Sequence, residues 1–128
     1  MMQLGYNLLT EKPIIVNMEN TGHACIVGGT GSGKSIATLY FLYNLLKNYK
    51  VKLTICDFKK TGDYEGISDR FAKFDNVTQC IEEYYDDYEM TPENNSQIKL
   101  LIIDEYAGYM IWVTQRDKKK AEEIKQKI

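Results

Sequence analysis

The sequence predicts an α/β domain, a three-layer sandwich around a mostly parallel sheet. Segments with strand-like and helix-like patterns alternate along the 128 residues, which favours parallel strands joined by right-handed crossovers. A glycine-rich loop, residues 28–35, stands between a predicted strand and a predicted helix. A later aliphatic run ends in two carboxylates, Asp104 and Glu105. The length suits a single domain over residues 1–128.

In the first half of the chain, the pattern predicts a short strand at residues 14–17 and a buried strand at residues 23–27, which leads into the glycines. A third strand is expected at residues 51–56, with Asp57 at its carboxyl end. Residues 34–49 are expected to form a helix, because apolar side chains recur there at helical spacing. These side chains are Ile36, Leu39, Tyr40, Tyr43 and Leu46.

In the second half, glycines predict a loop around residues 62–66, followed by a short strand at residues 71–74. A helix is expected over residues 77–88 and a loop over residues 93–97. The unbroken aliphatic run at residues 100–103 predicts a buried strand. Residues 118–128 fit an amphipathic helix.

Composition limits the function classes. The chain is 44% hydrophobic and 27% charged, as in ordinary soluble proteins. Its net charge of -2 shows no basic excess of the kind that indicates nucleic-acid binding. No apolar run approaches the roughly 18 residues of a membrane span. The single histidine, His23, is expected to be structural. The three cysteines have no metal-binding spacing, and we expect buried, reduced thiols of a cytoplasmic protein. They are Cys25, Cys56 and Cys80.

The loop sequence GGTGSGKS matches G-x-x-x-x-G-K-[ST], the P-loop pattern, at every fixed position. Glycines let several backbone N–H groups converge on phosphate oxygens, and the helix N-terminus adds partial positive charge. Lys34 would place its ammonium on the outer phosphates, and the Ser35 hydroxyl would bind Mg²⁺. We assign nucleotide binding to Gly28, Gly29, Thr30, Gly31, Ser32, Gly33, Lys34, Ser35 and Ile36.

The acidic pair completes a hydrolytic site in this prediction. Asp104 would hold Mg²⁺ through its water shell, at the strand end where ligands bind in such sheets. Glu105 suits the general base that orients and polarises the attacking water. Aspartate followed by glutamate after a strand is typical of P-loop proteins that hydrolyse ATP. We therefore expect an ATPase in which Glu105 and Lys34 are catalytic, with ATP and Mg²⁺ bound.

Three stretches together resemble the FtsK/SpoIIIE family of DNA-translocating ATPases, which includes the coupling ATPases of conjugative elements. They are GHACIVGGTGSGKS, ICDFKKTGDYEGI and LLIIDEYAGYM, in this order within residues 13–110. The second stretch resembles the family's Asp-Pro-Lys segment, with Phe58 in place of the proline. The resemblance implies a RecA-like P-loop NTPase fold of the ASCE type, double-stranded DNA as partner, a hexameric homo-oligomeric ring and a parent protein that is membrane-associated in some members.

In the resembling family the core continues with a helix, a central strand that carries a polar sensor, and an arginine from a neighbouring subunit. We therefore expect a motor domain truncated after the Asp-Glu strand and the following helix. Residues 114–116, TQR, come too soon after Asp104 to be that sensor. A sheet without its central strand leaves unpaired edges, so we expect the isolated chain to be marginally stable or to associate.

Several alternatives stay open on the sequence. The chain could be a nucleotide-binding or assembly module without catalysis, or a small-molecule kinase, in which the aspartate strand would lie directly beside the loop strand. Asp57 and Lys59 either support the nucleotide site or a subunit face, or form a salt-bridged loop. Tyrosines at 84, 85 and 88 are expected to pack rather than stack on bases, and Trp112 to pack in the core.

Overall fold

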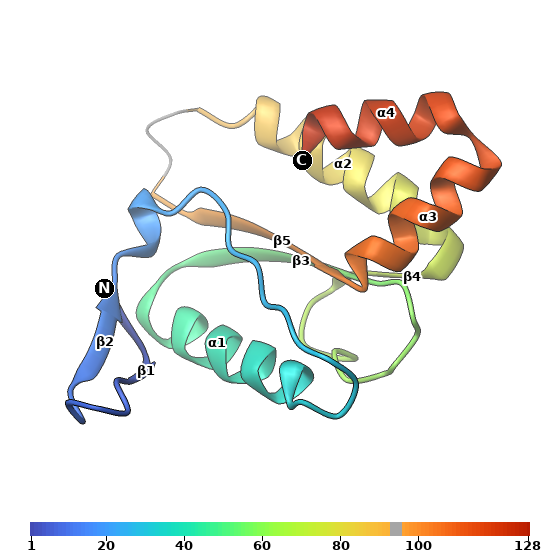
Figure 1. Cartoon of the computed structure of the whole chain (residues 1–128). Helices are drawn as coiled ribbons and strands as arrows, with labels where there is room; N and C mark the ends of the chain where they lie inside the picture. Colours follow the sequence, from blue (N-terminus) through green and yellow to red (C-terminus); the bar gives the residue numbers. More distant parts are fainter. Residues whose placement is uncertain (93–95) are drawn as a thin grey trace. The chain divides into compact units, whose positions relative to one another are not determined.

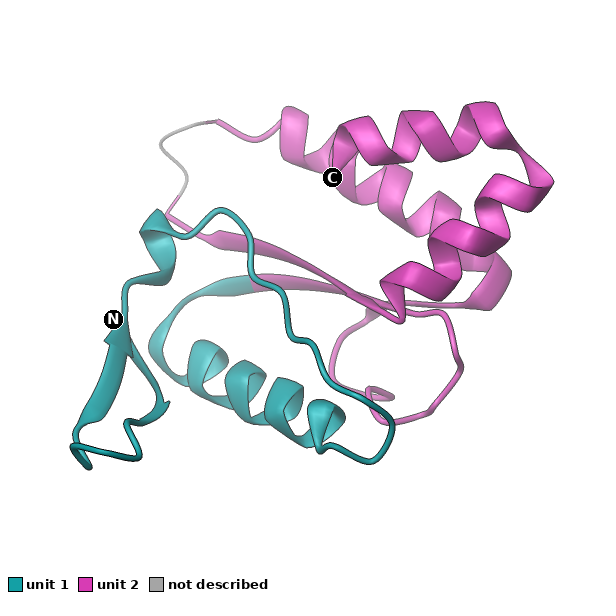
Figure 2. Ribbon diagram, in the orientation of Figure 1, with its two compact units in different colours: residues 1–51 teal, residues 52–128 magenta. Residues whose placement is uncertain are grey.

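The protein is described by a computed structural model that covers residues 1–92 and 96–128. The chain divides into two compact units, Met1–Val51 and Lys52–Ile128 (Figure 2). The architecture is α/β with a three-stranded parallel sheet, so the predicted fold class is confirmed. The loop predicted at residues 93–97 lies largely outside the described residues.

The first unit begins with a β-hairpin. Strands β1 (Met2–Tyr6) and β2 (Pro13–Val16) pair in antiparallel fashion, and the register shifts between Gln3 and Gly5 (Figure 1). In the connecting turn, the Asn7 side chain accepts hydrogen bonds from two backbone N–H groups, those of Leu9 and Thr10. Strand β2 was predicted, whereas β1 was not, because Gln3 and Gly5 weaken its apolar signal.

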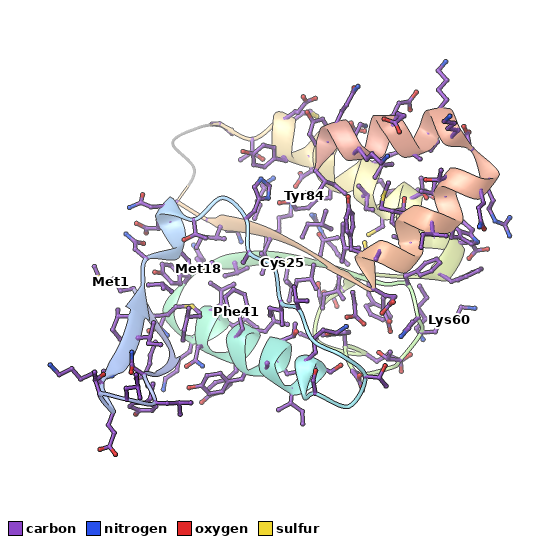
Figure 3. The ribbon with its side chains drawn as sticks, in the orientation of Figure 1. Met1, Met18, Cys25, Phe41, Lys60 and Tyr84 are labelled. Atoms are coloured by element: carbon purple, nitrogen blue, oxygen red, sulfur yellow. The ribbon has the colours of Figure 1, made fainter. Side chains whose placement is uncertain are left out.

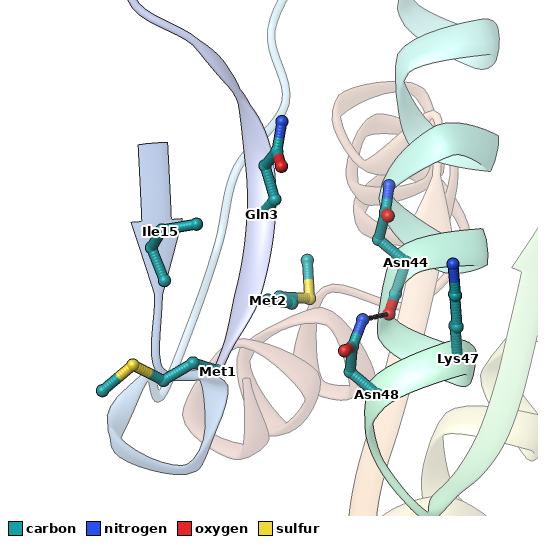
Figure 4. A pocket seen from close by; sticks show the side chains of 7 residues that line it. All are labelled: Met1, Met2, Gln3, Ile15, Asn44, Lys47 and Asn48. Carbon is teal, nitrogen blue, oxygen red and sulfur yellow. Dashed lines mark hydrogen bonds between the residues drawn. The ribbon is translucent and has the colours of Figure 1, made fainter. Parts of the chain in front are cut away.

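A 3-10 turn, η1 (Met18–Asn20), follows the hairpin, and helix α1 (Lys34–Asn48) comes after the glycine-rich loop. Met2 of β1 is 2% exposed and lies on the side of the strand that faces α1 (Figure 4). Beside it is a pocket of about 410 Å³. The pocket is lined by Met1, Met2, Gln3, Ile15, Asn44, Lys47 and Asn48.

The helix predicted at residues 34–49 is confirmed, but the apolar side chains whose spacing predicted it are not the ones that α1 buries. Leu42 and Leu45 are buried, whereas Ile36 is 74% exposed and Tyr43 is 64% exposed. Both sets of side chains have helical spacing, because apolar residues surround most of this helix. The periodicity therefore identified the helix correctly but could not select its buried face.

The strand predicted at residues 23–27 is also absent. These residues join neither sheet and are exposed, including His23 and Cys25 (Figure 3). A β-strand needs a neighbouring strand to receive its ladder of hydrogen bonds, and no described strand pairs with this segment. The predictions of a buried Cys25 and of His23 at a strand entrance are wrong for the same reason.

The second unit contains the parallel sheet. Its strands are β3 (Val51–Asp57), β4 (Arg70–Lys73) and β5 (Ile98–Asp104), in the order β4-β3-β5 (Figure 1). Strand β3 is central, and five consecutive residues from Leu53 to Asp57 are buried, as expected for a parallel strand covered on both faces. Each of the three strands was predicted to within two residues at each end.

Three helices complete this unit: α2 (Val77–Glu89), preceded by the 3-10 turn η2 (Phe74–Asn76), then α3 (Tyr106–Arg116) and α4 (Lys118–Lys127). One apolar core joins β3 to all three helices. Trp112 of α3 packs against this core, as predicted. Asp117 separates α3 from α4, and its side chain accepts the Lys120 N–H at 3.0 Å. The core residues are Cys56, Val77, Ile81, Tyr109, Met110, Val113, Ala121 and Ile124.

Helices α2 and α4 were predicted, but α3 was not. Its first turn follows directly on the acidic pair and contains Gly108, a residue that weakens a helical pattern. Residues 114–116 belong to this helix, which agrees with the prediction that they are no sensor strand. Among residues 1–92 and 96–128, no helix has the length and apolar character needed to cross a membrane.

Candidate functional site

The glycine-rich loop has the backbone of a tight, exposed turn. Gly31 and Gly33 have φ angles of 77° and 87°, in the left-handed region that residues with a Cβ rarely adopt. The Ser32 N–H donates to the Gly29 carbonyl at 3.1 Å and closes the turn. A Cβ on Gly28 would collide with the Ser32 hydroxyl in this conformation.

The loop delivers the chain into α1 at Lys34. Gly33 is the N-cap, and no side chain caps this end of the helix. The first N–H groups of a helix have no partner within the helix, so those of Lys34, Ser35 and Ile36 are available to a ligand. Backbone donors, an uncapped helix dipole and a lysine match an anion such as a phosphate chain. The residues present therefore fit the predicted ligand.

The acidic pair lies at the carboxyl end of β5. Asp104 is the last residue of the strand, and Glu105 is the N-cap of α3. Glu105 has φ 62° and ψ 47°, a left-handed conformation that is costly for a non-glycine residue. Such strain persists only where the surrounding structure imposes it, and it is common at functional sites. Glu105 therefore has a left-handed backbone, whereas Asp104 directly before it still belongs to the strand.

The Glu105 carboxylate has a partner that the sequence did not identify. Lys59, after β3, places its Nζ 3.2 Å from Glu105 Oε2. A Cβ on Gly108 would lie 3.1 Å from Glu105 Cγ and 3.7 Å from a Phe58 ring carbon, so the glycine leaves room for the carboxylate. Because parallel strands end at one edge of the sheet, residues far apart in sequence meet here.

Asp57, the last residue of β3, is fully buried. Its Oδ2 accepts hydrogen bonds from Thr61 Oγ1 at 3.3 Å and from the Gly62 N–H at 3.2 Å. Its Oδ1 is buried and has no hydrogen-bond partner among the described residues. Asp57 therefore shapes the loop that carries Lys59. The two residues proposed together from the sequence act differently, one on the loop backbone and one on Glu105.

Phe58, which stands where the resembling family has proline, anchors the same loop. Its ring stacks on Phe74 at a centroid distance of 5.1 Å and lies 5.8 Å from Tyr109 and 5.7 Å from Trp112. This aromatic cluster ties the end of β3 to helix α3. Packing of the Phe58 ring thus restrains this position, where a proline would restrain it through its fixed φ angle.

The predicted site residues fall into two groups. Residues 28–36 belong to the unit Met1–Val51, and Asp104 and Glu105 belong to the unit Lys52–Ile128. No three His, Cys, Asp or Glu side chains of the described ranges gather as a metal-binding cluster. This is compatible with Mg²⁺ held as in many nucleotide sites, by one or two protein side chains together with phosphate oxygens.

Comparison with known proteins gives one family. The model of the FtsK/SpoIIIE family matches residues 1–90. No curated protein and no solved structure matches the chain significantly. The family match covers more than half of the 128 residues, and it includes the glycine-rich loop and the segment of Asp57 and Lys59. We conclude that the chain belongs to the FtsK/SpoIIIE family of P-loop ATPases, for which membership implies nucleotide binding and a DNA motor.

Proposed function

We propose that this chain binds ATP with Mg²⁺ at residues 28–36 and hydrolyses it as part of a DNA-translocating motor. The observation that carries the proposal is the glycine-rich loop. It turns through left-handed glycines and opens onto the uncapped end of α1, with Lys34 as its first residue. Membership of the FtsK/SpoIIIE family supports this reading.

Each site residue has a chemical role in this proposal. Loop N–H groups and the Lys34 ammonium bind the phosphates, and Lys34 offsets the charge that develops during phosphoryl transfer. Ser35 would supply a hydroxyl ligand for Mg²⁺, and Asp104 would hold the ion through its water shell. Glu105 accepts a hydrogen bond from the attacking water and polarises it. ATP bound with Mg²⁺ supplies the phosphoanhydride bond that is cleaved.

The first test is titration of a fluorescent ATP analogue with Mg²⁺ into the 128-residue chain. We expect saturable binding that is lost in Lys34→Ala. Lys47→Ala is the matched control, because Lys47 lies in the last turn of the same helix. Equal binding by both variants, in chains shown to be folded by circular dichroism, would contradict the proposed site.

The ion pair between Lys59 and Glu105 favours a second candidate, a module that binds nucleotide without hydrolysing it. A carboxylate oxygen that is paired with an ammonium at 3.2 Å is less available to orient an attacking water. The substitution Glu105→Gln separates the two candidates. In a hydrolase it should abolish turnover and trap bound ATP, whereas in a binding module it should leave nucleotide binding and retention unchanged.

We further propose that the working form is a homo-oligomeric, hexameric ring around double-stranded DNA. Family membership supports this, while the net charge of -2 gives the chain no overall attraction to DNA. Sedimentation velocity with ATP, Mg²⁺ and duplex DNA tests it. We expect nucleotide-dependent assembly, and a monomer under every condition would contradict the ring for this chain.

A further inference from the structure

Two cysteines of the second unit lie against one another. Cys56 is in β3 and is fully buried, and Cys80 is in α2 and is half-buried. The two thiols are close enough to interact, and each shifts the pKa of the other. Cys80 packs against the apolar core that contains Cys56. The contact therefore joins the central strand to the helix that covers it.

The two sulfurs differ in access. Cys80 lines a pocket of about 250 Å³, so a small solute can reach its sulfur. Arg70 and two carboxylates also line this pocket. Cys56 is enclosed, and its sulfur can react only with a group already beside it. The lining residues are Thr54, Arg70, Cys80, Glu83, Tyr84 and Asp87.

The two thiols also differ in acidity. The hydrogen bond from Cys56 lowers the pKa of Cys80, and the Arg70 guanidinium acts in the same direction, while burial and Glu83 oppose them. The same hydrogen bond and burial raise the pKa of Cys56 well above its usual range. The accessible sulfur is therefore the better nucleophile, because thiolates and not thiols react with oxidants.

We propose that Cys56 and Cys80 form a reversible disulfide, with Cys80 as the sulfur that attacks peroxide and Cys56 as the resolving thiol. In the first step, the Cys80 thiol and hydrogen peroxide give a sulfenic acid and water. In the second step, the Cys56 sulfur attacks the Cys80 sulfur, the S–O bond of the sulfenic acid breaks, and the hydroxide leaves with the Cys56 proton as water. Peroxide is reduced and two thiols are oxidised, so atoms and electrons balance.

The geometry meets the main requirement for this reaction. Disulfide formation needs the sulfurs of two side chains to approach without large backbone movement. Cys80 already packs against the core cluster that contains Cys56, and the two thiols interact there. Cys25 provides an internal comparison. It is exposed and belongs to the other unit, and its reactivity should be that of an ordinary surface thiol.

The test treats the reduced 128-residue chain with one equivalent of hydrogen peroxide, alkylates the remaining thiols and maps the peptides by mass spectrometry. We expect a peptide pair linked through Cys56 and Cys80, reversed by dithiothreitol. Free thiols should fall from three to one per chain, with Cys25 still alkylated. Independent alkylation of Cys56 and Cys80 after peroxide would overturn the proposal.

Variants assign the two roles. In Cys56→Ala, Cys80 should stop at the sulfenic acid, which a dimedone probe labels. In Cys80→Ser, neither the disulfide nor a sulfenic acid at Cys56 should form. Cys25→Ser should leave the disulfide yield unchanged. This substitution alters an exposed side chain and not the core, so the test stays valid if a variant of Cys56 or Cys80 unfolds. A linkage that includes Cys25, or dimedone labelling of Cys56 alone, would overturn the proposal.

Discussion

Two residues at the predicted site, Gly33 and Glu105, have left-handed backbones, but they meet the cost differently. Gly33 has φ 87° and no Cβ, so the conformation is accessible to it. Glu105 has φ 62° and carries a full side chain. The first position is a requirement of the loop, and the second is strain held in place by its surroundings.

At Gly33 we expect Gly33→Ala to weaken binding of the ATP analogue and to destabilise the fold by about 1–2 kcal/mol, because a Cβ is disfavoured in the left-handed region. Gly22→Ala is the matched control, since Gly22 lies outside the glycine-rich loop, has no positive φ, and a Cβ there would meet no atom within 4 Å. Urea unfolding and nucleotide titration measure both effects. Equal losses in the two variants would show that the backbone conformation is not the cause.

At Glu105 we expect Glu105→Asn to stabilise the chain against urea by about 1 kcal/mol, because asparagine tolerates the left-handed region and is a favoured N-cap. Glu105→Gln keeps the strain and removes the charge, so it should be neutral or slightly destabilising through loss of the exposed pair with Lys59. Unfolding curves of both variants distinguish strain from charge. The strain interpretation is wrong if asparagine and glutamine have the same effect.

Lys59 gives a further prediction for an active chain. Lys59→Met removes the ammonium beside Glu105. If the ion pair keeps the Glu105 carboxylate from contacting the attacking water, kcat at saturating ATP should rise, with little change in KM. Lys60→Met is the control, because Lys60 Nζ lies over the Phe74 ring instead. Loss of turnover in Lys59→Met would mean that the lysine supports Glu105.

Among the elements, helix α2 places one carboxylate beside a cation from each of the three strands, in addition to its packing in the apolar core. Asp87 Oδ2 lies 3.0 Å from Lys52 Nζ in β3, 2.5 Å from Lys99 Nζ in β5 and 3.6 Å from Arg70 in β4. These cations stand near the first residues of the three strands. These ion pairs therefore lie at the edge of the sheet where the strands begin. Asp57 and Asp104 are at the opposite edge, where their strands end.

Hydrogen bonds from Lys99 and Lys52 lower the pKa of Asp87 to about 2. A carboxylate with a lowered folded-state pKa stabilises the fold above its ordinary pKa and loses this contribution as the pH falls through the folded value. Asp87→Asn should therefore reduce the loss of stability between about pH 4 and pH 2, and should cost about 1 kcal/mol at neutral pH, since the side chain is 37% exposed.

Urea unfolding at several pH values measures the Asp87 contribution, and the difference between the two chains removes the titration of other carboxylates. Asp86→Asn is the matched control, because Asp86 is the exposed neighbour on the same helix. A pH dependence unchanged by Asp87→Asn would show that this network does not contribute.

For the whole molecule, the exposed apolar segment at residues 23–27 is expected to promote self-association. Ile26 is 42% exposed and Val27 is 86% exposed, in a segment that joins neither sheet. Exposed apolar chain with unpaired backbone groups promotes association. We expect concentration-dependent self-association in sedimentation, reduced by Val27→Ser but not by Ile111→Ser, a control within α3 that is 61% exposed. A monodisperse monomer that unfolds cooperatively would contradict this expectation.

The sequence by itself determined the features that depend on local chemistry. The loop sequence GGTGSGKS predicted a turn before α1, and the left-handed Gly31 and Gly33 are where close backbone approach requires glycine. Aliphatic runs predicted strands β3 and β5, since strands in a parallel sheet need continuous apolar residues. The predicted burial of β5 is wrong, because each of its residues is only partly buried, whereas β3 is buried from Leu53 to Asp57. The placement of Asp57 and Asp104 at strand ends followed directly from these runs.

Only the tertiary structure decided what depends on neighbours distant in sequence. Residues 23–27 have strand-like composition but no pairing strand, and α1 buries Leu42 and Leu45 although its other face is also apolar. The pair between Lys59 and Glu105 and the contact between Cys56 and Cys80 join residues on different elements. Pairing, burial and ion pairs are properties of two partners, and a pattern along one segment contains only one of them.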